Sequence, residues 1–280
     1  MFADPIKKCS QTAGRIVKLA DENPIGFWIS SAMAGAYVGL GIILIFTLGN
    51  LVDPSIRPLV MGGTFGIALT LVIMAGSELY TGHTMFLAFG AKTGEITWFD
   101  NLRILPQTWA GNLLGSVMVA LLFFYAGGGA LLPETSSLLH KVALAKTSAS
   151  IDVLLFKGIL CNWLVCLAIW MCQRVEGTGR FIAIWWCLLA FIACGYEHSV
   201  ANMTIFALSW FGQHSDAYTL SGIGHNLLWV SIGNAISGAA FMGLGYWYST
   251  PKEQRPMFKP TKNDNLDDTI EVSKAAEATQ

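Results

Sequence analysis

Charged residues are scarce in this sequence of 280 residues. Asp, Glu, Lys and Arg make up 12% of it, about half of their share in an ordinary soluble domain. The hydrophobic share is 54%, with ten tryptophans and a mean hydropathy of +0.53. Basic blocks are also missing, and a net charge of −1 favours no nucleic-acid partner. This composition is typical of an integral membrane protein embedded in a lipid bilayer.

The sequence also lacks the usual marks of cofactor or metal chemistry. Its six cysteines form no CxxC pair and five lie in apolar runs, so we expect small buried core residues rather than disulfides or a zinc site. No nucleotide loop, catalytic triad or metal cluster occurs, and five scattered histidines make a haem enzyme improbable. We therefore expect no cofactor, no metal and no enzymatic activity.

Six long apolar runs predict six membrane spans, since a span needs about 20 mostly apolar residues. No apolar stretch typical of a signal peptide precedes them; residues 3–20 instead predict an amphipathic helix. We divide the chain into an N-terminal amphipathic helix (1–25), a six-helix channel domain (26–250) and a polar tail (251–280) that we expect to be disordered. The runs lie in residues 26–48, 59–77, 104–133, 157–174, from 181 onward, and 225–248.

The distribution of Lys and Arg predicts the orientation. With six spans, both termini lie on the same side of the membrane. Thirteen of the 17 basic residues fall on that side, three (Arg57, Lys141 and Lys146) fall in the opposite loops, and Lys157 stands at the edge of the fourth span. By the positive-inside rule, both termini are predicted to be cytoplasmic.

The two halves of the sequence resemble each other. AGSE at residues 75–78 matches CGYE at 194–197, and GNLLG at 111–115 matches GNAISG at 233–238. Three spans per copy is an odd number, so the second copy is predicted to enter the membrane inverted. Inverted repeats recur in transporters, where the substrate site lies near the midplane between the repeats.

Spans two and five are too long to be continuous helices. Residues 59–90 would extend about 48 Å, against a hydrocarbon core of about 30 Å, and residues 181–211 show the same excess. Polar segments interrupt both runs, ELYTGH at 78–83 and EHSVAN at 197–202. We predict a break in each span, with short second halves at about 84–90 and 203–211 whose N-termini favour anions.

Two interpretations of His198 stay open. It is either a structural histidine in the packed bundle or a pathway residue, and we favour the pathway because ionisable groups are expensive within a membrane. Glu78 and Glu197 would repel an anion, so we expect them to accept backbone N–H bonds at the breaks or to orient His198. Lys146 and Lys157 are either solvated lysines or cations that attract anions to the outer mouth.

Several segments resemble the formate/nitrite transporter family, and in particular its nitrite-conducting branch. The match covers about residues 1–250 and leaves out the tail. It rests on GYEHSVANM at 195–203, NWLVCLAIW at 162–170, SAMAGAYVGLG at 31–41 and GNLVDPS at 49–55.

The resemblance implies an all-α, aquaporin-like protomer of six helices, assembled as a homopentamer in the bacterial inner membrane with one pore in each protomer. It places His198 in the middle of the pore, with Thr81 facing it from the break in span two. It also brings Asn162, Asn202, Lys146 and Glu197 to the pathway. Two apolar constrictions are implied, formed by Leu69, Leu79 and Tyr80 on the cytoplasmic side and by Phe65 and Phe191 on the periplasmic side.

The sequence therefore predicts a channel for nitrite and similar small monovalent anions, in which His198 passes a proton to the anion so that a neutral acid crosses the apolar rings. Formate and hydrosulfide share the size and charge of nitrite and remain alternatives. A neutral-solute channel is a further alternative, although the paired Asn-Pro-Ala turns of aquaporins are missing. A quinone-linked oxidoreductase and a structural scaffold are the remaining candidates.

Overall fold

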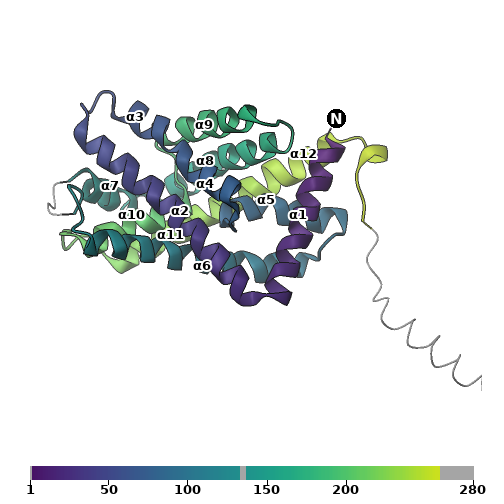
Figure 1. Cartoon of the computed structure of the whole chain (residues 1–280), viewed down its shortest axis with the longest axis horizontal. Helices are drawn as coiled ribbons and strands as arrows, with labels where there is room; N and C mark the ends of the chain where they lie inside the picture. The colour runs from purple at the N-terminus through teal and green to yellow at the C-terminus, as the bar shows by residue number, and fades with distance from the viewer. Residues whose placement is uncertain (1, 133–136, 259–280) are drawn as a thin grey trace, which may run out of the picture.

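The computed structural model describes residues 2–132 and 137–258, and these residues form helices and connecting segments without any strand. Figure 1 shows the helices gathered into one bundle. In chain order they are α1 (Ala3–Glu22), α2 (Pro24–Leu51), α3 (Arg57–Thr64), α4 (Gly66–Leu71), the π-helical η1 (Val72–Gly76), α5 (Tyr80–Thr93), α6 (Trp98–Tyr125), α7 (Leu138–Thr147), α8 (Ile151–Cys172), α9 (Thr178–Ala193), α10 (Ser199–Phe211), α11 (Leu220–Ile236), the π-helical η2 (Ser237–Leu244), α12 (Gly245–Ser249) and a short 3₁₀ turn, η3 (Lys252–Gln254).

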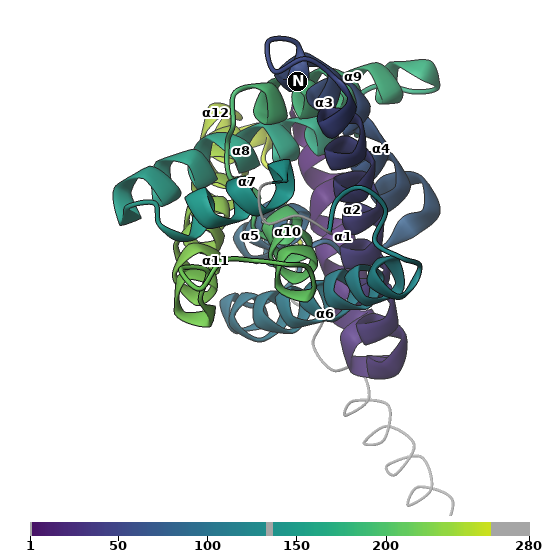
Figure 2. The ribbon, with the colours of Figure 1, turned by 90° about the vertical axis from the view of Figure 1, so that its left-hand side faces the viewer.

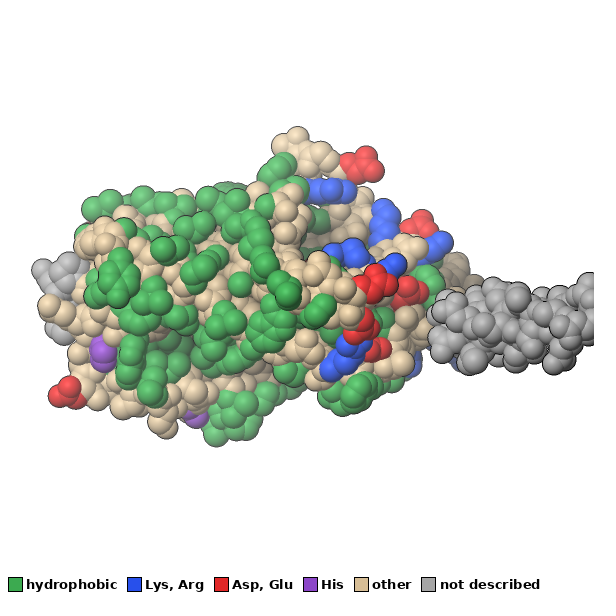
Figure 3. Space-filling view, turned by 60° about the horizontal axis from the view of Figure 1, so that its bottom comes forward, with side chains coloured by type: hydrophobic (Ala, Val, Ile, Leu, Met, Phe, Trp, Pro, Cys, Tyr) green, Lys and Arg blue, Asp and Glu red, His purple; other side chains and the backbone are tan. Residues whose placement is uncertain are grey.

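The chain is a multi-pass membrane protein. Large apolar side chains are exposed along the sides of the bundle, whereas charged side chains gather at the end where α1 lies (Figure 3). So much exposed apolar surface is unsuited to water. Within the described part of the chain, five helical stretches are long and apolar enough to cross a membrane: Pro24–Leu51, Arg57–Gly76, Trp98–Tyr125, Ile151–Cys172 and Leu220–Ser249. Two shorter helices, α9 and α10, are apolar as well.

Two apolar runs are interrupted where the sequence analysis predicts breaks. The first helical run ends with η1, residues 77–79 are not helical, and α5 begins at Tyr80. The second run ends with α9, and α10 begins at Ser199. Gly76 (φ +80°) and Gly195 (φ +66°) turn the chain in the left-handed region that glycine adopts without strain.

The second segments α5 and α10 begin at residues 80 and 199, each four residues earlier than the predicted 84 and 203. The polar residues assigned to the loops instead form the first turn of each helix, where the free backbone N–H groups need partners. In the view along the bundle, α10 lies in the middle, enclosed by the longer helices (Figure 2).

Glycine lets the long helices approach closely. A Cβ atom at Gly115 of α6 would meet the backbone carbonyl of Ala32 in α2, and one at Gly35 would meet the carbonyl of Asn112. Gly233 of α11 lies in the same way against the backbone of α8. Small residues at helix crossings allow this packing in membranes, where lipid-like side chains offer no hydrophobic gain.

Short helices cover the two ends of the bundle. The helix predicted over residues 3–20 is present as α1, which lies at one end against α5, while α7, which the sequence analysis does not predict, lies at the other end (Figure 1). Residues 251–258 of the predicted tail follow α12, and Phe258 donates its backbone N–H to the carbonyl of Thr93 (2.9 Å). The disorder expected for residues 259–280 lies outside the described residues.

Candidate functional site

Three cavities share lining residues and together lead through the bundle. The α7-side cavity, of about 290 Å³, is lined by residues that include Arg57, Lys146 and His198. The α1-side cavity, of about 180 Å³, is lined by residues that include Arg15 and His83. Between them lies a constriction of about 10 Å³, roughly the space that one water molecule occupies. The chain therefore has two larger cavities separated by a narrow segment, which shares Phe191 and His198 with the first cavity and Leu79 with the second.

The constriction is apolar except for one imidazole. Phe65, Leu69, Leu79 and Phe191 line it together with His198. The rings of Phe65 and Phe191 meet edge to face at 5.7 Å between centroids, and Phe191 stacks on His198 at 5.9 Å. A bare ion that entered this segment would lose its hydration and find only one polar side chain in exchange, which makes the segment unfavourable for charge.

His198 is fixed in one orientation by two hydrogen bonds. Its Nδ1 accepts the backbone N–H of Ala201 (3.1 Å) and thereby caps α10. A nitrogen that accepts carries no hydrogen, so the neutral ring holds its hydrogen on Nε2. Nε2 lies 3.1 Å from Oγ1 of Thr81. The buried histidine thus presents an N–H donor at the constriction.

Both short inner helices begin at the centre of the bundle, and an asparagine caps each of them. Asn112 of α6 accepts the backbone N–H of Tyr80 (2.9 Å), the first residue of α5. Asn234 of α11 accepts the backbone N–H of Ser199 (3.0 Å), the first residue of α10. The positive ends of both helices are thereby held at the constriction, where they favour an anion.

The same two asparagines tie each break to the neighbouring spans. The side-chain amide of Asn112 donates to the carbonyls of Ser31 (2.8 Å) and Glu78 (2.9 Å). The amide of Asn234 donates to the carbonyls of Gly158 (2.8 Å) and Glu197 (3.0 Å). Irregular backbone at membrane depth requires such partners, since no water or lipid group replaces them.

A chain of polar side chains lies beside the α7-side cavity. Nζ of Lys146 forms an ion pair with Oε1 of Glu197 at 2.8 Å. The amide of Asn202 donates to the other carboxylate oxygen of Glu197 (2.6 Å) and to Oδ1 of Asn226 (2.9 Å). The Glu197 side chain is 6% exposed, so its negative charge is buried but compensated by the lysine.

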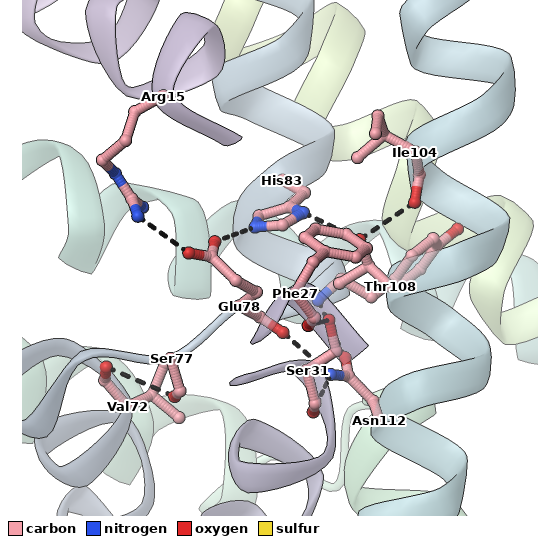
Figure 4. A network of polar contacts seen from close by, with 11 residues as sticks. Arg15, Phe27, Ser31, Val72, Ser77, Glu78, His83, Ile104, Thr108 and Asn112 are labelled. Carbon is pink, nitrogen blue, oxygen red and sulfur yellow. Dashed lines mark hydrogen bonds and ion pairs between the residues drawn. The ribbon is translucent and has the colours of Figure 1, made fainter. Parts of the chain in front are cut away.

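A matching chain lies beside the α1-side cavity (Figure 4). Arg15 of α1 forms an ion pair with Oε1 of Glu78 at 2.9 Å. Nε2 of His83 lies 2.7 Å from Oε2 of Glu78, and Nδ1 of His83 lies 3.0 Å from Oγ1 of Thr108. The two networks have the same order. In each, a basic side chain pairs with a glutamate, the glutamate contacts the residue five positions further on, and that residue contacts a side chain of the next long helix.

The partners of the two carboxylates correct one expectation. Glu78 and Glu197 were expected to accept backbone N–H bonds or to orient His198. Their side chains instead bind a cation and a side chain on the following helix. The reason is that asparagine amides already satisfy the backbone at the breaks, and a buried carboxylate is stabilised more by a full positive charge.

The structure separates the predicted pathway residues into two groups. His198, Lys146 and Asn202 line the α7-side cavity, Glu197 pairs with Lys146 beside it, and Thr81 lies behind the lining against Nε2 of His198. Asn162 lines none of the three cavities, and its amide instead bridges the carbonyls of Thr81 and Asn234 with the hydroxyl of Thr84. This position suits a structural bridge between helices.

Tyr80 and Lys157 also lie outside the three cavity linings. The hydroxyl of Tyr80 donates to the carbonyl of Ser231 in α11 (3.1 Å). The backbone carbonyl of Lys157 accepts the N–H of Glu197 (3.3 Å), while its side chain is half-buried in α8. A role for either side chain in the pathway stays a prediction.

Sequence reasoning missed Arg15, His83, Thr108 and Arg57. The repeat contains a signal for His83, since it follows Glu78 by the same five positions that separate Asn202 from Glu197. Arg15 and Arg57 are distant in sequence from the breaks, so no local pattern joins them to the site. Among the described residues, no group of His, Cys, Asp and Glu is suited to hold a metal ion.

Known proteins share the sequence and the architecture of this chain. The sequence model described as formate/nitrite transporter matches residues 4–248. The chain belongs to the formate/nitrite transporter family. Within this family, it is 73% identical to the nitrite transporter NirC of Salmonella typhimurium over 256 residues, which cover 91% of this chain and 95% of that protein.

Two solved structures share the fold of this formate/nitrite transporter family member. One, described as an FNT family ion channel, is 73% identical and superposes with a TM-score of 0.88 over 89% of this chain and 99% of the other. The second, described as a pentameric formate channel with formate bound, has a TM-score of 0.72 at 23% identity and covers 82% and 98%. The second likeness concerns the fold alone.

Proposed function

We propose that the chain is a channel that passes nitrite and similar small monovalent anions across the bacterial inner membrane. The observation that carries this proposal is the pair of larger cavities that meet at one narrow, mostly apolar constriction lined by His198. The 73% identity to a nitrite transporter favours nitrite among the possible anions. That relative is a transporter by name, which supports transport rather than catalysis.

The electrostatics of the described residues favour an anion over a cation or a neutral solute. Each buried carboxylate is paired with a basic side chain, Glu78 with Arg15 and Glu197 with Lys146, so neither presents an uncompensated negative charge. Two helix N-termini point their positive ends at the constriction. Arg57 adds a further positive charge to the lining of the α7-side cavity.

His198 supplies the polar contact in the dry segment. An anion that takes the place of the Thr81 hydroxyl accepts a hydrogen bond from Nε2–H. When the ring is an imidazolium, the Nε2–H bond breaks as an O–H bond forms on the anion, and a neutral acid crosses the apolar rings. A second ring proton has to occupy Nδ1, where it displaces the Ala201 amide, so the imidazolium forms when an anion lies against the ring and stabilises it.

The proposal is tested by electrogenic flux measurements in proteoliposomes with a panel of nitrite, formate and hydrosulfide, alongside swelling assays with glycerol. Wild-type protein should carry nitrite and give no glycerol swelling. His198→Asn and His198→Phe should lose the part of nitrite flux that responds to pH on the α7 side, because neither side chain exchanges a proton near neutral pH. An unchanged pH dependence would remove the proton-transfer role, and glycerol swelling without anion current would overturn the anion channel.

We further propose that spans two and five are broken, that the six spans form two inverted repeats and that the assembly is a homopentamer with both termini in the cytoplasm. The matching roles of Asn112 and Asn234, and of the Glu78 and Glu197 networks, support the repeat. The clustering of charged side chains at the α1 end supports the orientation. The domain division into residues 1–25, 26–250 and 251–280 is part of the same proposal.

A further inference from the structure

The two polar networks differ at one position. Asn202 occupies the α7-side network, whereas His83 occupies the equivalent place in the α1-side network. An amide cannot take up a proton in the physiological range, whereas imidazole is the side chain that exchanges one near neutral pH. The α1-side network therefore contains a proton-exchanging group that its counterpart lacks.

The surroundings of His83 satisfy both of its protonation states. Oγ1 of Thr108 has a single hydrogen and two available acceptors, the carbonyl of Ile104 (2.9 Å) and Nδ1 of His83 (3.0 Å). With the neutral ring, Thr108 donates to Nδ1 while Nε2–H donates to Glu78. With the imidazolium, Nδ1–H donates to Thr108, whose hydrogen turns to Ile104. No polar atom of the ring or of the Thr108 hydroxyl is left unpaired in either state.

His198 is bound differently. Its Nδ1 accepts a backbone N–H that cannot reverse its role, so a second ring proton always removes the cap of α10. Of the two histidines that flank the constriction, His83 is therefore the one whose site accommodates a gained proton.

We propose that Glu78 and His83 form a second proton-exchange site on the α1 side of the constriction, built to give a proton to, or take one from, a weak-acid substrate in the α1-side cavity. The proposal rests on the function proposed above. Both side chains line that cavity. In the exchange, the Nε2–H bond of the imidazolium breaks as an O–H bond forms on Oε2 of Glu78, and the Glu78 carboxyl then gives this proton to the anion, so that neutral imidazole and the carboxylate remain.

The net charge of this site depends on the protonation state of His83. Arg15 of α1 and Glu78 cancel each other, so the network is neutral with a neutral ring and carries one positive charge with the imidazolium. α8 contributes Cys172 to the cavity, and Lys8 of α1 donates to the backbone carbonyl of Gln173 in its lining. The sequences of η2 and α10, which also pack on α5, contain no titratable side chain, and α6 faces His83 with the hydroxyl of Thr108.

His83→Asn is the decisive variant, because it installs the residue that the α7-side network already uses. Nitrite flux is measured in inside-out and right-side-out membrane vesicles while the pH on one face is lowered from about pH 8 to about pH 5. For wild-type protein, acid on the α1 side should raise flux about fivefold, the factor that one unit charge gives across about 4 Å of water. His83→Asn should remove this rise and leave the response to pH on the α7 side.

Two controls make the result specific. His225→Asn changes a histidine of α11 that is bound to the carbonyl of Ala149 and should keep the wild-type response on both sides. Asn202→His is the reciprocal change and should make the pH response from the α7 side larger than in the wild type. A His83→Asn profile equal to that of the wild type, or an equal loss of flux at every pH, would overturn the proposal.

Infrared difference spectra of the purified full-length protein, recorded between the same two pH values without nitrite, separate this inference from the proposed function. Wild-type protein with isotope-labelled histidine should show a histidine band coupled to a carboxylate band, which is missing in His83→Asn and retained in His225→Asn. If the wild type carries no nitrite but shows these bands, the proposed function fails and the proton site stands. If the bands are missing from the wild type, the proton site is overturned, whatever the flux.

Discussion

Lys146 is the residue on which the electrostatics of the α7-side cavity most depend. Its side chain is 15% exposed and pairs with Glu197, whereas Lys157 lines none of the cavities. Burial strengthens this ion pair, but removal of the lysine would leave the carboxylate of Glu197 buried without a compensating positive charge, which is energetically unfavourable. The importance of the lysine thus lies in compensating Glu197 as much as in attracting anions.

Lys146→Ala should reduce nitrite flux at least about fivefold, because the uncompensated charge of Glu197 then faces the pathway. The flux is measured in proteoliposomes at limiting nitrite. Lys157→Ala serves as the matched control and should remain near the wild-type value. The double variant Lys146→Ala/Glu197→Gln should regain flux relative to the single variant, and a double variant as slow as the single one would contradict this account.

At the scale of helices, the crossing of α2 and α6 depends on glycine. Gly115→Ala places a methyl group against the backbone carbonyl of Ala32, which cannot turn away as a side chain can. Overpacking of this kind costs about 1–3 kcal/mol, so the variant should unfold at lower temperature in detergent, as measured by fluorescence-detected size-exclusion chromatography after heating.

Gly63→Ala is the matched control for this prediction. Gly63 also lies in a helix, α3, but a Cβ atom there meets nothing within 4 Å. Alanine is the better helix former by about 1 kcal/mol, so this variant should be as stable as the wild type or slightly more stable. Equal destabilisation by both substitutions would show that helix packing is not the cause.

The sequence predicts the interrupted helices because their polar patches and lengths are local properties of the chain. Residues 59–90 and 181–211 are too long for one crossing, and each contains a polar patch at the place where the helix stops. The start of α5 and of α10 was misplaced because it depends on caps from other spans, Asn112 and Asn234. No signal in the broken segments themselves reveals these partners.

The candidate site was predictable only where a motif or the repeat marks it. Thr81 lies against His198, and four of the five residues assigned to two separate constrictions line a single one, which Tyr80 does not line; their roles in the pathway stay predictions. The ion pair of Arg15 with Glu78 joins residues 63 positions apart, and helix packing, which the sequence pattern does not specify, brings them together. The short helix α7 was not predicted because its apolar residues are too few to be distinguished from the preceding span.

The proposed orientation of the whole molecule leads to a labelling prediction. Five of the six cysteines are buried and Cys194 is exposed, so Cys194→Ser gives a background in which single introduced cysteines can be read. Lys18→Cys lies on α1 and Lys141→Cys on α7, at opposite ends of the bundle. An impermeant maleimide added outside intact spheroplasts should label position 141 and spare position 18 until the membrane is opened.

Labelling of position 18 in intact spheroplasts would contradict the cytoplasmic placement of α1. Labelling of both positions would contradict the sealed constriction or the integrity of the spheroplasts, and an engineered cysteine in a known cytoplasmic protein distinguishes these two cases. The result also fixes which aqueous compartment sets the proton concentration at His83.

The narrowness of the constriction has an electrical consequence. With aqueous solution in the two larger cavities, a transmembrane voltage would fall mainly across the narrow segment between them rather than evenly across the bilayer. A full elementary charge that crosses this gap gains or loses about 2.3 kcal/mol per 100 mV, whereas a neutral acid gains nothing. The cell's resting voltage therefore opposes the inward passage of the bare anion, whereas the protonated form follows its own concentration gradient alone.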